Sequence, residues 1–295
     1  MRTASIIVAT DGTASSKAAV RWAAREAERR NRLLRIMHVF DWEWREDESS
    51  YAGPYGDLAR RTAEGVVAGA FDLARRAAPH VQIETDTLIG HAASRLLAMI
   101  ADADLVVLGS RGRGGFASLL LGSVSQRVAT HARCSVVIVR GRGDTAEGPV
   151  VVGVDEARDA DHVLETAFEA AAGRGCPLAV VHAYLPTVPL WVRGVAATDI
   201  DTPDEDAAEQ SGVEETLAPW RAKFPEVPAT ITVSHESAAA ALVHASHRAS
   251  LVVVGSHNHG VVASAFLGST GMQLLHHADC PVYIARPHLD AAAAR

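Results

Sequence analysis

The chain of 295 residues has few lysines, few cysteines and no long apolar run. Its two lysines, Lys17 and Lys223, do not lie in a Gly-Lys-Ser/Thr string, which excludes a Walker A loop. Three cysteines with no CxxC pair exclude a disulfide framework and a zinc ribbon, so we expect reduced thiols. No stretch approaches the ~18 apolar residues of a membrane span, and the first apolar run is too short for a signal peptide. These absences predict a cytoplasmic protein without a membrane partner.

Positive charge is also in deficit. The formal net charge is −7, which argues against a general nucleic-acid binder. The deficit is uneven, because residues 1–147 carry +3 (20 basic, 17 acidic) and residues 148–295 carry −10 (8 basic, 18 acidic). Ten of the 14 histidines lie in the second part. The two parts therefore differ in their electrostatics, and the second is less suited to an anionic ligand.

The sequence contains a duplication. Leu-Val-Val-Leu-Gly-Ser at 105–110 returns as Leu-Val-Val-Val-Gly-Ser at 251–256, and Leu-Leu-Leu-Gly-Ser at 119–123 returns as Ala-Phe-Leu-Gly-Ser at 265–269. A period this long indicates a duplicated domain rather than a solenoid. We predict a first domain at 1–141, a linker at 142–148, a second domain at 149–288 and a tail at 289–295.

Each copy alternates short Val- and Ile-rich runs with amphipathic stretches. This predicts strands near 5–10, 33–39, 81–88, 105–109 and 136–140, repeated near 150–154, 178–183, 229–234, 251–255 and 282–286. Helices are expected between them, at about 16–30, 57–78, 92–103 and from 122 in the first copy, with Ser15 or Ser16 capping the first. Strict alternation predicts an α/β fold with a parallel sheet, which binds ligands beyond the carboxyl ends of its strands.

A glycine-rich loop follows the fourth strand and leads into a helix near Gly122. Glycines allow close approach to an anion, and a helix N-terminus offers N–H donors and a positive dipole end. This pattern favours a phosphate site, although a plain connecting turn has similar composition. The dinucleotide fingerprint follows the first strand of its fold, and here the turn after the first strand lacks it. The Arg-Gly-Arg-Gly-Gly string at 111–115 is too short to indicate RNA binding in an acidic chain.

The spacing of this loop carries a family resemblance. Gly109-x-x-Gly112, nine residues and then Gly122-Ser123 resembles the ATP-binding signature of the universal stress protein family. Asp11, Val-Arg-Trp-Ala-Ala at 20–24 and His38-Val39 also resemble that family's sequence. The resemblance covers roughly 4–140 and 149–286, as in tandem-domain members of actinobacterial type. It implies two Rossmann-like (adenine nucleotide alpha hydrolase-like) domains, each a five-stranded parallel sheet with helices on both faces.

The resemblance also implies ATP as the ligand, and Mg²⁺ with it. In the first copy it implies contacts from Thr10, Asp11, Gly12, Val39, Gly90, Gly109, Arg111, Gly112, Arg113, Gly122, Ser123, Val124 and Ser125. In the second copy it implies contacts from Asp155, Ala183, Gly255, His257, Asn258, Gly268, Ser269 and Thr270. Asp11 would lie near the ribose or a nucleotide-bound Mg²⁺; alternatively it belongs only to a turn that leads into the first helix.

The second copy departs from this pattern. Asn258 replaces the second glycine, histidines replace both loop arginines, and Glu236 stands where the first copy has Gly90. Arginine remains charged and binds phosphate through two donors, whereas histidine is mostly neutral at pH 7. We therefore expect the second copy to bind ATP more weakly, or only as the pH falls and the histidines become protonated.

The resemblance implies a nucleotide-dependent regulator of stress response, growth arrest or dormancy. A weak ATPase or an autophosphorylating enzyme is the alternative, but no base or nucleophile besides Asp11 and the loop serines is evident for phosphoryl transfer. A flavin or AMP electron carrier is a third possibility. Family members pair through the fifth strand, so the resemblance also implies an intramolecular pseudo-dimer of the two copies and a homodimer of the chain, with no identified protein partner.

Overall fold

The computed structural model describes residues 5–40, 54–101, 103–112, 120–143, 147–155, 160–186, 202–256 and 267–287. The chain divides into two compact units, one built on Met1–Asp144 and the other on Thr145–Ala263 with Leu267–Ala285. Each unit is an alternating series of strands and helices, as the duplication predicts. No helix of the described residues is long and apolar enough to cross a membrane.

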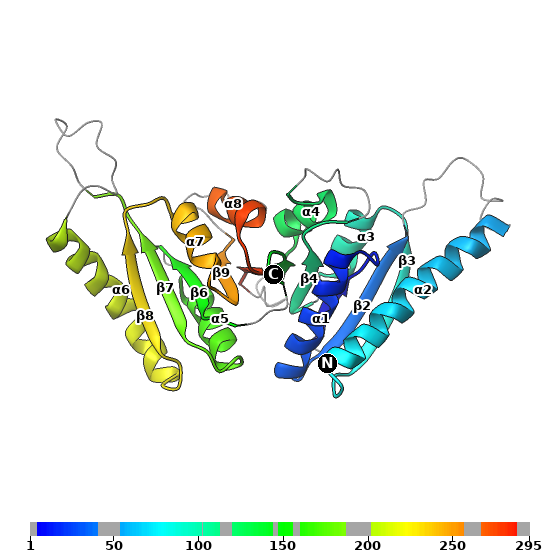
Figure 1. Cartoon of the computed structure of the whole chain (residues 1–295), viewed down its shortest axis with the longest axis horizontal. Coiled ribbons are helices and arrows are strands. Elements are labelled where there is room, and N and C mark those ends of the chain that lie inside the picture. The colour runs from blue at the N-terminus through cyan, green and yellow to red at the C-terminus, as the bar shows by residue number, and fades with distance from the viewer. Residues whose placement is uncertain are drawn as a thin grey trace, which may run out of the picture. The chain divides into compact units, whose positions relative to one another are not determined.

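The first unit is a doubly wound parallel sheet. Its elements are β1 Ser5–Ala9, α1 Ala14–Arg29, β2 Leu33–Phe40, α2 Pro54–Ala77, β3 Ile83–Ile89, α3 Ala92–Met99, β4 Leu105–Gly109, α4 Ser123–His131 and β5 Ser135–Val139. The strand order is β3-β2-β1-β4-β5, all parallel. Helices α1 and α2 pack together, as do α3 and α4, and the two pairs cover opposite faces (Figure 1). The order reverses at β1 and β4, so the ends of these strands mark the expected ligand site.

The second unit repeats this arrangement. Its elements are β6 Val150–Val154, α5 Ala160–Ala172, β7 Leu178–Ala183, α6 Pro203–Lys223, β8 Ala229–Ser234, α7 Ala238–Ser246, β9 Leu251–Gly255, α8 Ser269–His277 and β10 Val282–Ala285. Its strand order is β8-β7-β6-β9-β10, which corresponds strand for strand to β3-β2-β1-β4-β5 of the first unit, and all strands are again parallel. Helices α5 and α6 pack together and α7 and α8 form the other pair. The predicted α/β class and tandem architecture are confirmed.

Apolar strands form the core of each unit because both faces of each sheet are covered. Every residue of β4 and β5 is buried, which matches the continuous apolar runs expected for a parallel sheet. Trp22 of α1 is 6% exposed, so it packs in the core as its position on an apolar helix face predicts. None of the three cysteines forms a disulfide, and Cys134 and Cys280 are buried just before the last strand of each unit.

One predicted cap is wrong. Helix α1 is capped by Thr13, whose side chain accepts the N–H of Ser16, and not by Ser15 or Ser16. Threonine fits this role because its hydroxyl accepts a helix N–H while its backbone stays extended. The two serines make other contacts that shape the candidate site.

Candidate functional site

The turn between β1 and α1 is held together by its own side chains. Asp11 Oδ1 accepts the Thr13 N–H at 3.0 Å and the Thr13 hydroxyl at 2.7 Å. Gly12 has a φ of +82°, a left-handed conformation that favours glycine. Thr10 is 5% exposed, with its hydroxyl 3.1 Å from Ser16 Oγ. Asp11 therefore shapes the turn that leads into α1, at the sheet edge where a ligand is expected, and its role toward a ligand stays a prediction.

Ser15 joins this turn to the glycine loop after β4. Its Oγ accepts the backbone N–H of Arg111 at 3.2 Å. A methyl group added at Gly109 would lie 2.6 Å from Ser15 Oγ and 2.7 Å from Ser15 C. Only glycine lets the start of α1 approach β4 this closely, so Gly109 acts through packing.

The other two signature glycines lie where the loop approaches Asp11 and α4. A methyl group on Gly112 would lie 2.9 Å from Asp11 Oδ2, so the second carboxylate oxygen faces the loop. The Gly122 N–H donates to Ser110 O at 2.8 Å, and a methyl group on Gly122 would lie 3.5 Å from Gly112 N. The three glycines and Asp11 thus surround one small region at the ends of β1 and β4.

Helix α4 presents its N-terminus to this region. Gly122 is its N-cap and has no side chain, so among the described residues no side-chain cap takes up the first N–H groups of the helix. Ser123 is exposed and Val124 half-buried. Ser125 is buried, and its hydroxyl donates to Gly109 O at 2.6 Å, which assigns it to the loop's support.

The ends of β2 and β3 form the remaining side of the region. His38 is 3% exposed and its Nδ1 lies 2.7 Å from Thr10 O. A carbonyl can only accept, so the imidazole donates through Nδ1 and fixes the end of β2, where Val39 lies, against β1. Gly90 has a φ of +124°, and its N–H donates to Phe40 O at 3.0 Å. The sequence did not predict this hydrogen bond of His38, but the corresponding histidine of the second copy, His182, makes the same contact.

The second copy keeps only part of this arrangement. His182 Nδ1 lies 3.3 Å from Val154 O, which repeats the His38 contact. Gly268, which has no side chain to cap the helix, is the N-cap of α8 and is followed by Ser269 and Thr270. Asp155 is exposed at the end of β6, and Ala183 ends β7.

Three differences distinguish the second region from the first. A methyl group added at Gly255 would lie 3.3 Å from the side-chain atom Val163 Cγ2, whereas one added at Gly109 meets the backbone of Ser15. Glu236, an exposed carboxylate, stands in place of Gly90. Ser237 caps α7 through its own side chain, whereas His91 makes no such bond to α3. Arg113, His257 and Asn258 lie outside the described residues.

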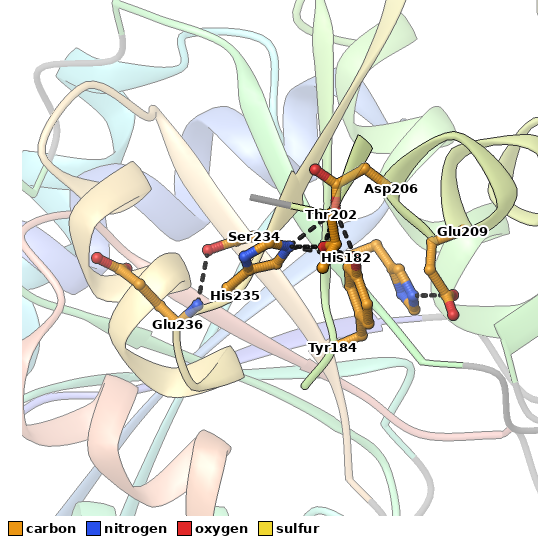
Figure 2. Close-up of polar contacts among 8 residues, drawn as sticks. All are labelled: His182, Tyr184, Thr202, Asp206, Glu209, Ser234, His235 and Glu236. Atoms are coloured by element: carbon orange, nitrogen blue, oxygen red, sulfur yellow. Dashed lines mark hydrogen bonds and ion pairs between the residues drawn. The ribbon is translucent and has the colours of Figure 1, made fainter. Parts of the chain in front are cut away.

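A polar cluster at the ends of β7 and β8 distinguishes the second copy. Figure 2 shows Tyr184, Thr202 and His235 converging on Asp206 of α6. His235 Nε2 lies 2.7 Å from Asp206 Oδ1, and the Tyr184 hydroxyl donates to the same oxygen. Hydrogen bonds from Tyr184 and His235 hold the pKa of Asp206 below its ordinary value. Burial and the bond to Asp206 raise the pKa of Tyr184.

This cluster was not predicted from the sequence, although one signal pointed to it. The duplication aligns Tyr184 with Phe40, and His235 with Ile89, which pairs with Phe40 in the first sheet. The first copy thus has two apolar residues where the second has a phenol and an imidazole. The Nε2 atom of His235 lies within hydrogen-bond distance of Thr202, Tyr184 and Asp206.

Within the part of the chain that the structure describes, no group of three metal-ligating side chains occurs. Mg²⁺ that arrives with a nucleotide needs only one or two carboxylates besides phosphate oxygens. Asp11, with one oxygen facing the glycine loop, fits that limited requirement.

Comparisons with known proteins agree with the duplication. The family model described as "Universal stress protein family" matches residues 3–140 and 148–286. Universal stress protein Rv2005c of Mycobacterium tuberculosis is 31% identical over 291 residues, covering 95% of this chain and 96% of its own. A universal stress protein structure from Archaeoglobus fulgidus has a TM-score of 0.72 at 18% identity, covering 97% of this chain and 99% of that one. A universal stress protein solved in complex with cAMP matches 48% of this chain and 99% of its own at 28% identity, with a TM-score of 0.38.

Proposed function

The chain belongs to the universal stress protein family, and we propose that its first copy binds ATP and acts as a nucleotide-dependent regulator of the stress response. One observation carries this proposal: Gly112 of the glycine loop, the N-terminus of α4 at Gly122 and the carboxylate of Asp11 meet at the reversal of strand order. Such a region offers backbone donors and a positive dipole end to a phosphate.

Different residues of the first copy contact different parts of the nucleotide or support the loop that does so. The phosphates lie against the first N–H groups of α4 and the backbone of 109–112, with the Arg111 side chain, exposed and nearby, adding positive charge. Ser15 and Ser125 hold the loop in shape through their contacts with Arg111 N and Gly109 O. Asp11 Oδ2 faces the loop and suits the ribose or a nucleotide-bound Mg²⁺.

We further propose regulation rather than rapid catalysis. Phosphoryl transfer needs a group that positions the nucleophile, in addition to charge stabilisation. Two candidates for that task, Asp11 and Ser125, are already engaged in support: Asp11 Oδ1 by Thr13, and the Ser125 hydroxyl by Gly109 O. Turnover of ATP is therefore expected to be slow. Cytoplasmic location and dimer formation remain part of the proposal.

The two copies are proposed to be unequal sites. Glu236 brings a carboxylate where Gly90 leaves room, and residues 148–295 carry the excess of negative charge. Since like charges repel, the second copy binds ATP less tightly than the first.

A matched pair of glycines tests this. Gly122 and Gly268 are the N-caps of α4 and α8, with φ of −77° and −60°, which alanine also adopts. A methyl group on Gly122 makes only ordinary contacts, the nearest at 3.5 Å to Gly112 N, so Gly122→Ala folds but narrows the phosphate site. Calorimetric titration with ATP, and separately with cAMP, should show a Kd for Gly122→Ala raised about tenfold or more, the size of one or more lost hydrogen bonds to a charged group.

Gly268→Ala is the control, and it should leave the tighter site unchanged. Absence of binding by either nucleotide to the full chain, or equal losses in both variants, would overturn the proposal. Rapid ATP turnover that Gly122→Ala abolishes would instead favour the enzyme.

A further inference from the structure

Helix α6 of the second copy is anchored unevenly. Its buried residues are Val213 and Leu217, both in its C-terminal half. The first half begins with an acidic turn, and no residue from Pro203 to Gly212 is buried. Apolar burial therefore holds the C-terminal half of α6 on the sheet, and the N-terminal half must be held by contacts of another kind.

Polar contacts hold that beginning. Asp206, in the first turns of the helix, is bonded by Tyr184 after β7, by His235 after β8 and by the Thr202 hydroxyl, the last at 3.4 Å. The Tyr184 hydroxyl also lies 3.1 Å from Thr202 Oγ1. We name Tyr184, Thr202, Asp206 and His235 the α6 latch; Figure 2 shows that they join three segments.

A second pair acts on the next turn of the helix. His182 Nε2 lies 3.0 Å from Glu209 Oε2, and His182 is itself held by Val154 O of β6. The other charged groups near the latch are Glu205, which acts on Tyr184, and Glu236, which follows His235 in the chain. Among the residues that the structure describes, the charged groups named here besides the histidines are thus all carboxylates.

Histidine is the side chain that changes charge between pH 5 and pH 8. Asp206 stays ionised through that range, because its pKa lies below the ordinary value, and Tyr184 stays protonated, because its pKa lies above. A protonated His235 forms an ion pair with Asp206, whereas the neutral ring leaves one hydrogen bond to the same carboxylate. The contact is therefore stronger on the acidic side.

We propose that the α6 latch is a pH-responsive device, which holds the first half of α6 on the sheet when His235 is protonated and loosens it when His235 is neutral. The second half of α6 stays in place at either pH because Val213 and Leu217 remain buried. The device is confined to the second copy, since Phe40 and Ile89 occupy the corresponding positions of the first. It does not depend on nucleotide binding.

Hydrogen exchange on the full chain without nucleotide tests the device. Protection of peptides covering 203–212, corrected for the intrinsic effect of pH on exchange, should be about threefold higher near pH 6 than near pH 8, as for a partly exposed pair. Peptides covering 213–223 should change little. In His235→Gln, whose amide keeps a donor near the same place but does not titrate, most of this pH response should disappear.

Two further variants make the outcome decisive. Asp204→Asn removes one carboxylate charge from an exposed residue in the same helical turn as Asp206, and it should keep the wild-type response. Adding Glu209→Gln to His235→Gln should remove what response remains. A wild-type chain with no pH response, or a response that survives in the double variant, would overturn the proposal. If His235→Gln misfolds, Asp206→Asn gives the same test, because it removes the ion pair but keeps an acceptor.

Discussion

The close approach of α1 to β4 gives a sharp test, because the duplication supplies its own control. Alanine at Gly109 would place a methyl group 2.6 Å from Ser15 Oγ, 2.7 Å from Ser15 C and 2.8 Å from Ser15 O. Two of these atoms are backbone, so the start of α1 must move. Alanine at Gly255, the corresponding position, meets only Val163 Cγ2 at 3.3 Å, which a small side-chain shift relieves.

The magnitude follows from the type of clash. Overpacking that shifts backbone costs about 1–3 kcal/mol, and a contact relieved by a side chain costs less. A free energy of ~1.4 kcal/mol corresponds to a tenfold change in an equilibrium constant. Gly109→Ala should therefore raise the equilibrium constant for local opening of β4 and of the start of α1 by about 5- to 150-fold. Gly255→Ala should change the exchange of β9 by about fivefold or less, the change that ~1 kcal/mol produces.

Hydrogen exchange read peptide by peptide is the suitable assay, since a two-domain chain need not unfold in one step. Ser15 also accepts Arg111 N, so Gly109→Ala should weaken nucleotide binding together with local stability. An equal or larger effect of Gly255→Ala would refute the reasoning, because it would mean that approach to backbone is not what requires glycine at 109.

Three further predictions concern buried and polar side chains. Ser125→Ala removes a buried donor to a carbonyl and should lower the free energy of unfolding of its unit by about 1–2 kcal/mol, measured by urea titration. The pKa of Tyr184 is raised above its ordinary value of 10.0, so the hydroxyl stabilises the fold fully below pH 10.0. This stabilisation is lost as the pH rises through the higher pKa of the folded state. The difference in free energy of unfolding between wild type and Tyr184→Phe should therefore shrink above pH 10.0. Burial raises the pKa of the Cys134 thiol to about 11, and Cys280 is 1% exposed, so a thiol reagent near pH 8 should modify Cys176 first and the other two only after denaturation. Mass spectrometry of the peptides identifies the order; rapid labelling of Cys134 in the native chain would contradict it.

Most of the fold follows from local pattern. Continuous apolar runs such as 105–109 and 136–140 predict buried parallel strands, and β4 and β5 lie within one residue of those bounds. Helix ends were less accurate: α3 ends at Met99 rather than near 103, and α1 is capped by Thr13. Caps depend on which of several adjacent hydroxyl groups finds an N–H, and composition does not decide that.

The candidate site was predictable in its residues but not in their roles. The spacing of Gly109, Gly112 and Gly122 indicates a phosphate loop, and the structure brings all three to one edge with Asp11. Gly109, however, is required by Ser15, a residue 94 positions earlier in the chain. Ser125 supports the loop rather than facing outward. Such roles depend on contacts between segments distant in sequence.

By itself the sequence determined the duplication, the α/β alternation and the position of the glycine loop, because these depend on periodicity and on residue types within one segment. Only the tertiary structure decided which side chains meet. Tyr184, Asp206 and His235 lie on three segments, and no local pattern indicates that a phenol and an imidazole share one carboxylate. Hydrogen bonds act over about 3 Å, so their partners become known only when the chain has folded.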